Sequence, residues 1–204
     1  RSSTTEHKLK ETDEIVQTME STNKSELIFF SNKCVAYKMK TYDLADAKVS
    51  TMGEYLPGIL GLEEDEKIVY TVVTTDYNGE MLFENGKMAK VALSNYETKT
   101  NRKKLIGAYG NKSPICDIRL LDEDKDVVLM SDNNRVLLVN TEKIPLKATK
   151  STQGIQVITL RKKDAKVVRV VDKEQCTVED IEHYRPKNIP AAGGILRGED
   201  NQIS

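Results

Sequence analysis

One pattern occurs three times in this sequence at intervals of about 50 residues, and it restricts the possible folds more than any other feature. In each copy, a short apolar run leads into a polar turn, and a second apolar run follows. The turns are Ser31-Asn32-Lys33, Glu84-Asn85-Gly86-Lys87 and Ser131-Asp132-Asn133-Asn134. Asn and Gly suit such turns because they tolerate positive φ. The sequence therefore predicts three β-hairpins, with Ser31, Phe83 and Ser131 at equivalent places.

A second feature recurs behind the hairpins with the same period. Ser50-Thr51-Met52-Gly53 follows the first hairpin, and Ser151-Thr152-Gln153-Gly154 follows the third. Behind each come an apolar stretch, a charged turn and a further β-rich run, which is Ile68–Val73 in the first copy and Val167–Val171 in the third. Asp13–Met19 reads as the leading strand of the first copy. Four strands in about 50 residues match one propeller-type blade.

We therefore predict an all-β fold, a propeller-like array of three to four four-stranded blades. A single blade cannot bury both of its faces, so neighbouring blades must stack. The repeats are assigned to residues 13–65, 66–113 and 114–164, with a partial repeat at 165–177 and a C-terminal tail at 178–204. The tail holds the best helix candidate, Val178–Tyr184. The chain has no Trp, which excludes the WD40 signature, and the double glycines of kelch propellers do not recur in its repeats. The alternative is a β-sandwich whose hairpins are similar by accident.

The composition argues against an enzyme. The two histidines, His7 and His183, lie in polar terminal stretches, and no cysteine stands near either of them with the spacing of a zinc site. No phosphate-binding loop, dinucleotide fingerprint, nucleophile elbow or zinc-protease motif is present. We therefore expect no catalytic residue and no metal in this chain. The odd number of cysteines, 3, fits a reducing cytosol, and no apolar run reaches the length of a membrane span.

The hairpin sequences resemble blades of one known family, the C-terminal domains of the A subunits of bacterial type IIA topoisomerases, which are DNA gyrase and topoisomerase IV. Family blades read approximately apolar-Phe-Phe-Thr-Asn-Lys-Gly, followed by Val-Tyr-Arg-Leu-Lys. The first repeat has Leu27–Lys33 and then Tyr37–Leu44 in this frame. The second repeat, Phe83–Lys90, keeps the turn glycine, and the third, Met130–Val136, has Asn in its place. Because Asn also tolerates positive φ, the turn is expected to survive.

This resemblance implies a β-pinwheel, a propeller-like fold with strands exchanged between blades, which binds and bends duplex DNA on a basic outer rim. It implies that the catalytic tyrosine and the ATPase lie outside this chain, so that ATP and Mg²⁺ belong to the parent enzyme only. The implied partners are duplex DNA, the other domains of the A subunit, and the ATPase subunit of an A2B2 complex. No membrane is involved, and the implied location is the bacterial cytoplasm, at the nucleoid.

The sequence departs from the family's gyrase branch in two respects. Its net charge of -1 is less basic than a strong DNA wrapper would suggest. Gyrases carry a Gln-Arg-Arg-Gly-Gly-Arg-Gly box early in this domain, and no such box is found here. Two explanations stay open: the box lies upstream of Arg1, or the parent enzyme is of the topoisomerase IV type. The preference for supercoiling, relaxation or decatenation stays open with them.

The charges are nearly balanced overall, with 31 Lys and Arg against 32 Asp and Glu, yet they are segregated along each repeat. The second strand of each hairpin and the segment behind it are basic, and such local clusters, rather than net charge, contact phosphates. The predicted DNA-contacting residues are Lys33, Lys38, Lys40, Lys87, Lys90, Lys99, Arg102, Lys103, Lys104, Arg135, Lys147 and Lys150. Equivalent positions in a ring of blades share a rim, so we expect one exposed basic rim.

Two functions of different classes fit these observations. The first is a non-catalytic domain that binds, bends or wraps DNA and presents a segment for strand passage. The second is a propeller-like protein-interaction module without a nucleic-acid role, in which the lysines are ordinary solvated side chains. Duplex DNA binding with a steep salt dependence distinguishes the first function from the second.

Overall fold

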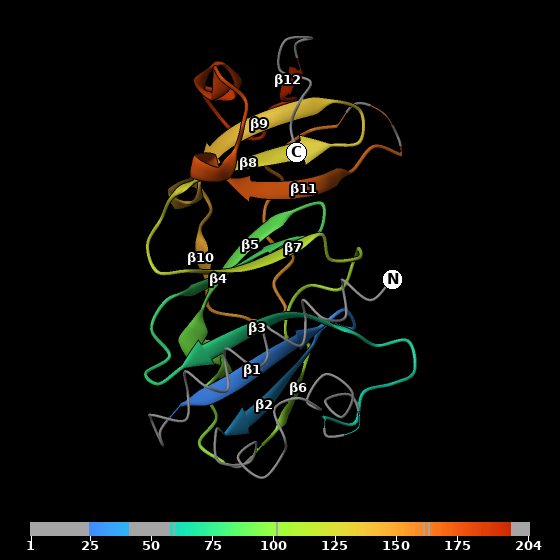
Figure 1. Ribbon diagram of the computed structural model, residues 1–204, viewed down its shortest axis with the longest axis vertical. Coiled ribbons are helices and arrows are strands. Elements are labelled where there is room, and N and C mark those ends of the chain that lie inside the picture. Colours follow the sequence, from blue (N-terminus) through green and yellow to red (C-terminus); the bar gives the residue numbers. More distant parts are fainter. Residues whose placement is uncertain are drawn as a thin grey trace. The chain divides into compact units, whose positions relative to one another are not determined.

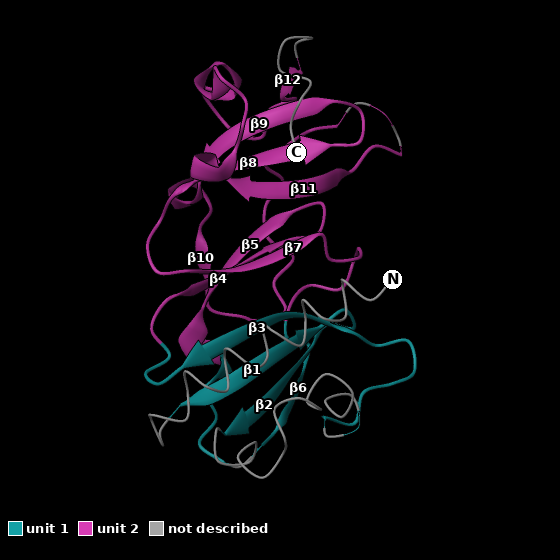
Figure 2. Cartoon of the chain, in the orientation of Figure 1, with its two compact units in different colours: residues 1–77, 96–108 teal, residues 78–95, 109–204 magenta. Residues whose placement is uncertain are grey.

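The computed structural model describes residues 25–40, 58, 60–100, 102–160, 162 and 164–196. The named elements in this part of the chain are β-strands and short 3-10 turns (Figure 1). The chain divides into two compact units, shown in Figure 2: unit 1 is residues 1–77 with 96–108, and unit 2 is residues 78–95 with 109–204. The expected leading strand Asp13–Met19 lies outside the described residues.

Unit 1 holds one four-stranded sheet with the strand order β3-β1-β2-β6. The strands are β1 (Glu26–Ser31), β2 (Val35–Lys40), β3 (Ile68–Thr74) and β6 (Lys104–Ile106). All of its strand pairs are antiparallel. Alternate side chains of the β1–β2 hairpin, including Leu27, Phe29 and Tyr37, form a buried apolar cluster. The alternation of the sequence therefore places one complete face of this hairpin in a core.

Unit 2 holds two four-stranded sheets, with the orders β10-β5-β4-β7 and β11-β8-β9-β12. The first consists of β4 (Glu80–Glu84), β5 (Met88–Ala92), β7 (Asp117–Leu121) and β10 (Leu146–Lys147). The second consists of β8 (Asp126–Ser131), β9 (Arg135–Asn140), β11 (Val167–Asp172) and β12 (Gly194–Ile195). The pair β10–β5 is parallel and the other strand pairs are antiparallel. The 3-10 turns are η2 (Leu93–Tyr96), η3 (Thr141–Lys143), η4 (Lys173–Gln175) and η5 (Ile181–Tyr184).

The fourth strand of each sheet comes from a later part of the chain than the hairpin it joins. β6 follows β5 in sequence but pairs with β2, and β10 follows β9 but pairs with β5. β12, near the end of the described chain, pairs with β9. This exchange of strands between consecutive hairpins is the arrangement of a β-pinwheel. The prediction of an all-β fold built from four-stranded blades is confirmed, and the sandwich alternative is wrong.

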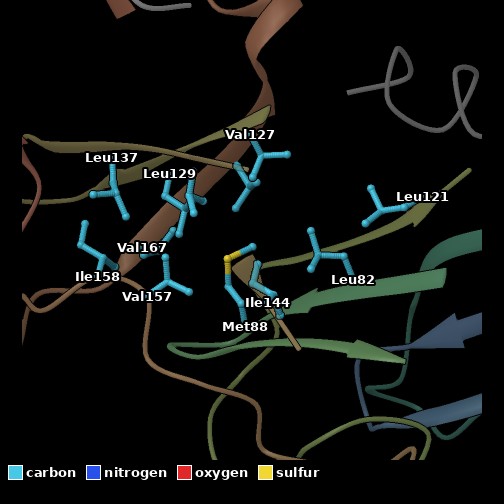
Figure 3. Packing of buried hydrophobic residues seen from close by; sticks show 12 residues of the cluster. Leu82, Met88, Leu121, Val127, Leu129, Leu137, Ile144, Val157, Ile158 and Val167 are labelled. Carbon is cyan, nitrogen blue, oxygen red and sulfur yellow. The ribbon is translucent and has the colours of Figure 1, made fainter. Parts of the chain in front are cut away.

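The core of unit 2 joins its two sheets (Figure 3). Leu82 and Met88 of the β4–β5 hairpin belong to the same buried cluster as Leu129 and Leu137 of the β8–β9 hairpin. Val157, in the connection that follows β10, completes it. The burial of each such side chain contributes about 2 kcal/mol. Stacking of one blade on the next thus supplies the apolar contacts that a single sheet lacks, as the sequence predicts.

The helix candidate in the tail is only partly right. The last four residues of Val178–Tyr184 form the 3-10 turn η5, not an α-helix. Val178, Ile181 and Tyr184 are nevertheless buried against one face of the β8–β9 hairpin. The apolar spacing therefore marked a packed segment correctly, while the segment is too short to form a stable α-helix.

The predicted equivalence of the hairpins is wrong by one residue in the middle repeat. β1 ends at Ser31 and β8 ends at Ser131, whereas β4 ends at Glu84 and not at Phe83. The charge of Glu84 suggested the start of a turn, yet its side chain is only 2% exposed. Its carboxylate accepts a hydrogen bond from the backbone N–H of Gly86 at 2.7 Å, which keeps a charged residue inside the strand.

The hairpin turns contain the positive φ angles that the sequence predicts. Gly86 has a φ of 100° and Asn134 a φ of 61°, so Asn does take the left-handed conformation in the third hairpin. The first hairpin has Cys34 there, with a φ of 60°. A thiol side chain is thus held in a backbone region that L-residues other than Asn and Gly rarely adopt.

Candidate nucleic-acid interface

The predicted basic residues divide into three groups by exposure. Eight are exposed: Lys33, Lys40, Lys87, Lys99, Arg102, Lys103, Lys104 and Lys147. Two are half-buried: Arg135 and Lys150. Two are buried: Lys38 and Lys90. Members of the set belong to both units, so their alignment along one rim stays a prediction.

The densest group of exposed cations lies in unit 1, on the segment that leads into β6. We call Lys99, Arg102, Lys103 and Lys104 the β6 basic segment. Arg102 and Lys103 precede the strand as predicted, whereas Lys104 is its first residue and not part of a loop. The backbone N–H of Lys38 donates to the carbonyl of Lys103 at 2.7 Å, and Lys104 Nζ lies 5.9 Å from the centre of the Tyr37 ring.

These contacts fix the backbone at Lys103 and Lys104, and the side chains of all four residues of the β6 basic segment are exposed. Leu105, between Lys104 and Ile106, is buried and anchors the strand. Because side chains alternate along a strand, Lys104 and Ile106 point to the same side. The segment is therefore a rigid, positively charged edge, which is the kind of surface that binds a phosphate backbone without large ordering cost.

Lys33 is exposed but has a partner of its own. Its Nζ lies 2.7 Å from the carboxylate of Asp65, and this ion pair raises the pKa of Lys33 and lowers that of Asp65. An exposed pair of this kind contributes little to stability. It does place an acid beside the lysine, so Lys33 is a weaker candidate for DNA contact than the β6 basic segment.

The expectation that Lys38 lies exposed on the basic rim is wrong. Its side chain is 5% exposed, and its Nζ donates to the hydroxyl of Thr98 at 3.0 Å. The same ammonium lies 3.5 Å from Glu26 and 5.1 Å from the centre of the Tyr77 ring. Lys38 therefore links the hairpin of unit 1 to the segment that follows η2, and its charge is paired with that of Glu26 inside the fold.

Lys90 is buried in the same manner, so its expected exposure on the basic rim is also wrong. Its Nζ donates to Asp124 at 3.0 Å and to the carbonyl of Thr141 at 2.9 Å, and lies 3.6 Å from Glu80. Thr141 opens η3, which follows the next hairpin. Lys90 thus ties the β4–β5 hairpin to two turns of the neighbouring blade. Its side chain is 6% exposed.

The sequence does contain a signal for this role. Lys38 stands directly opposite Ile28, and Lys90 opposite Leu82, each of which is the third residue of the hairpin's first strand. The first residues of these strands, Glu26 and Glu80, are therefore diagonal neighbours of the lysines. An acid at the start of one strand and a lysine opposite its third residue indicate an internal pair.

The third hairpin lacks this lysine and obtains its cation from the tail. Leu138 occupies the place opposite Val128, the third residue of β8. The first residue of β8, Asp126, accepts two hydrogen bonds from the guanidinium of Arg185 instead, at 3.0 and 2.9 Å. This ion pair and the hydrogen bond from Asn140 lower the pKa of Asp126.

Replacing Lys90 tests the structural role directly. We expect Lys90→Met to lower the free energy of unfolding by about 2 kcal/mol, because Asp124 and the Thr141 carbonyl lose a buried donor. Urea denaturation measures the change. Lys87→Met, at an exposed lysine of the same hairpin, is the control and should leave stability unchanged. Equal stability of the two variants would contradict the internal role of Lys90.

The remaining cations of unit 2 lie on or near its exchanged strands. Lys147 is an exposed residue of β10, and Lys150 follows it. Arg135 begins β9 directly opposite Ile195 of β12, and its guanidinium donates to the carbonyl of Gly193 at 3.3 Å. Arg135 therefore holds β12 in place while remaining partly exposed.

Comparison with known proteins gives a consistent answer. No family model matches the sequence. The A subunit of DNA gyrase from Helicobacter pylori is 29% identical over 163 residues, covering 71% of this chain and 18% of the relative. The A subunit of DNA topoisomerase 4 from Staphylococcus aureus is 21% identical over 175 residues, covering 83% of this chain and 22% of the relative.

The solved structures show the same fold. The C-terminal domain of E. coli ParC superposes with a TM-score of 0.67 at 13% sequence identity, covering 89% of this chain and 80% of that one. The chain is similar in sequence to type IIA topoisomerase A subunits, and its fold is that of their C-terminal domains. It spans about a fifth of the length of the curated relatives it matches. It accordingly has the β-pinwheel fold of those domains.

Two further observations concern the described residues. In that part of the chain, no group of three or more His, Cys, Asp and Glu side chains is placed to hold a metal ion. Likewise, none of the helical segments described is both long and apolar enough to cross a membrane.

Proposed function

We propose that this domain binds duplex DNA through its phosphate backbone and presents a bent segment for strand passage by a bacterial type IIA topoisomerase. The observation that carries the proposal is the β6 basic segment, which has four exposed cations. The backbone at Lys103 and Lys104 is fixed by the hydrogen bond from Lys38 and by strand pairing. The domain's kinship with the A subunits of gyrase and topoisomerase IV supports it.

The mechanism is electrostatic. Lysine and arginine side chains replace the counterions of the phosphates, so affinity falls steeply with salt and is independent of base sequence. The domain then acts within a larger enzyme, which we place in the bacterial cytoplasm at the nucleoid. Its partners there are the other domains of its own polypeptide and the separate ATPase subunit, while ATP and Mg²⁺ act outside this chain.

A fluorescence-anisotropy titration with duplex DNA at several salt concentrations tests the function. The proposal expects binding at low salt, with the logarithm of the affinity falling linearly against the logarithm of the salt concentration. No binding at low salt would overturn it. That result would favour the second candidate, a protein-interaction module, in which the exposed lysines keep the domain in solution without contacting nucleic acid.

Charge reversal at Lys103 and Lys104 locates the interface. We expect Lys103→Glu/Lys104→Glu to weaken DNA binding at least about tenfold and to lower the salt slope by about two units, because two phosphate contacts are lost. The melting temperature should change little, because both side chains are exposed. The control is Lys112→Glu/Lys166→Glu, which changes the net charge equally at exposed lysines outside the predicted set. Equal weakening by both pairs would mean that only the total charge matters.

A further inference from the structure

Unit 2 has a cavity beside the turn of the β4–β5 hairpin. Its volume is about 700 Å³, and exposed residues such as Ser113 and Gln156 stand at its mouth. Asn85 and Gly86 of the turn contribute to its wall, as do residues 165–168 around the start of β11. Clefts of roughly 300 to 1,000 Å³ are the size that binds small organic molecules. The cavity is therefore large enough for a ligand, and its wall comes from one unit.

The inner part of the wall is apolar. We call Ile115, Cys116, Ile158 and Val167 the cavity floor. Ile158 and Val167 are buried and belong to the apolar cluster of Figure 3, while the other two are half-buried. Burial and the neighbouring carboxylates raise the pKa of the Cys116 thiol to about 11. The thiol is therefore neutral near pH 7 and serves as a small apolar group, not as a nucleophile.

Two lysines supply the charge of the cavity, Lys162 and Lys166, which we call the cavity lysines. Both are exposed, and in the described part of the chain neither ammonium has an acidic partner. They differ in this from Lys90 and Lys173 of the same unit, which form ion pairs within the fold. None of the described residues that line the cavity is Asp or Glu. Cations without counter-charge over an apolar wall attract anions, because the low dielectric strengthens their field.

A ligand of this cavity has to match both parts of the wall. Inorganic phosphate would pair with the cavity lysines but would leave the cavity floor in contact with water. A neutral hydrocarbon would cover the floor but would give the lysines no counter-charge. Small-molecule sites typically combine an apolar lining with a few polar groups that orient the ligand. A small molecule with an apolar body and one acidic group satisfies both parts.

We propose that this cavity binds a small amphipathic anion, which is an organic carboxylate, sulfonate or phosphate. Its acidic group faces the cavity lysines and its apolar body contacts the cavity floor. The site contains none of the predicted DNA-contacting residues, so the inference goes beyond the proposed function and does not depend on it.

The experiment uses two fluorescent probes that differ by one acidic group. Anilinonaphthalene sulfonate carries a sulfonate, whereas phenylnaphthylamine has the same rings without it. Each probe is titrated into the full chain at pH 7, and amide NMR shifts locate the site. The test variant is Lys162→Gln/Lys166→Gln. The control variant is Lys143→Gln/Lys147→Gln, which removes the same charge at exposed lysines of unit 2 that do not line the cavity.

We expect the parent chain to bind the sulfonate probe more tightly than the neutral probe, with the largest amide shifts at Gly86, Cys116 and Val168. The test variant should bind the sulfonate probe about five- to tenfold more weakly, because each exposed lysine contributes about a factor of two to five. Its binding of the neutral probe should not change, and the control variant should bind both probes like the parent chain.

Three results would overturn the inference. The first is equal binding of the two probes by the parent chain. The second is an equal loss of sulfonate binding in the test and control variants, which would mean that only total charge matters. The third is a set of amide shifts that lies away from the cavity. None of these results depends on DNA, so the proposed function is tested separately.

Discussion

Gly154→Ala is expected to lower the free energy of unfolding by about 3 kcal/mol. Gly154 has a φ of +79°, which costs about 1 kcal/mol for an alanine. An alanine Cβ would also lie 2.2 Å from the carbonyl oxygen of Met88, so the segments around Gly154 and Met88 would have to move apart. Two backbone hydrogen bonds between Met88 and Ile155, both of 2.8 Å, would then be lost, at about 1 kcal/mol each.

Gly86→Ala is the matched control for this prediction. Gly86 has a φ of +100°, and a Cβ added there meets nothing within 4 Å. An alanine at this position therefore introduces backbone strain without a steric clash, and we expect the free energy of unfolding to fall by only about 1 kcal/mol. Urea denaturation of both variants separates the two contributions. If the two variants lost the same free energy of unfolding, the close approach of the Gly154 and Met88 segments would not contribute to the effect of Gly154→Ala.

Glu84→Gln is expected to stabilise the protein by about 2 to 3 kcal/mol at pH 8 and to change little below pH 4. Burial raises the pKa of Glu84 to about 7, and the charge of Asp117 acts in the same direction, while the Gly86 N–H opposes them. Asp117 lies directly opposite Glu84 in the β4–β7 pair. Each unit of pKa difference corresponds to about 1.4 kcal/mol.

How stability changes with pH follows from the upward shift of the Glu84 pKa. The pKa of Glu84 is higher in the folded state than in the unfolded chain, so its contribution to stability is fully present below pH ~4.5. It is lost as the pH rises through about 7, when a buried carboxylate must ionise beside Asp117. Glutamine keeps an acceptor for the Gly86 N–H and cannot ionise, so this part of the pH dependence should disappear.

Other groups near Glu84 also titrate, so part of the pH dependence is expected to remain in the variant. Burial raises the pKa of Asp117 as well, although the guanidinium of Arg119, at 2.7 Å, opposes the shift. Burial and the neighbouring carboxylates raise the pKa of the Cys116 thiol to about 11. Glu123→Gln, at an exposed acid of unit 2, is the control. An identical pH profile for both variants would contradict the role assigned to Glu84.

The hairpins of this protein were predictable because the information for them is local. A strand of alternating or continuous apolar residues and a turn that tolerates positive φ occupy adjacent positions in the chain, and the positive φ of Gly86 and Asn134 confirms the turn chemistry. The recurrence of the hairpins then required stacking, because one sheet cannot bury both faces. Phe29, Phe30, Leu82 and Val128 of these hairpins are buried accordingly.

The basic surface was only partly predictable, since a lysine looks the same in a sequence whether it faces solvent or an acid. Lys103 and Lys104 are exposed as expected. Lys38 and Lys90 are buried because Glu26, Glu80 and Asp124 supply opposite charge at positions that only strand pairing and blade contact bring near. The diagonal spacing of acid and lysine, once the register is known, could have revealed both pairs.

Local sequence information was sufficient for the all-β class, for the three hairpins and their turns, and for the resemblance to the C-terminal domains of topoisomerase A subunits. The tertiary structure decided which hairpin each fourth strand joins, that Glu84 is a buried strand residue, and which cations remain available for a ligand. The physical reason is the range of the interactions. Turn geometry and alternation act over a few residues, whereas strand exchange and the burial of a charge depend on partners far away in the chain, such as Thr141 for Lys90.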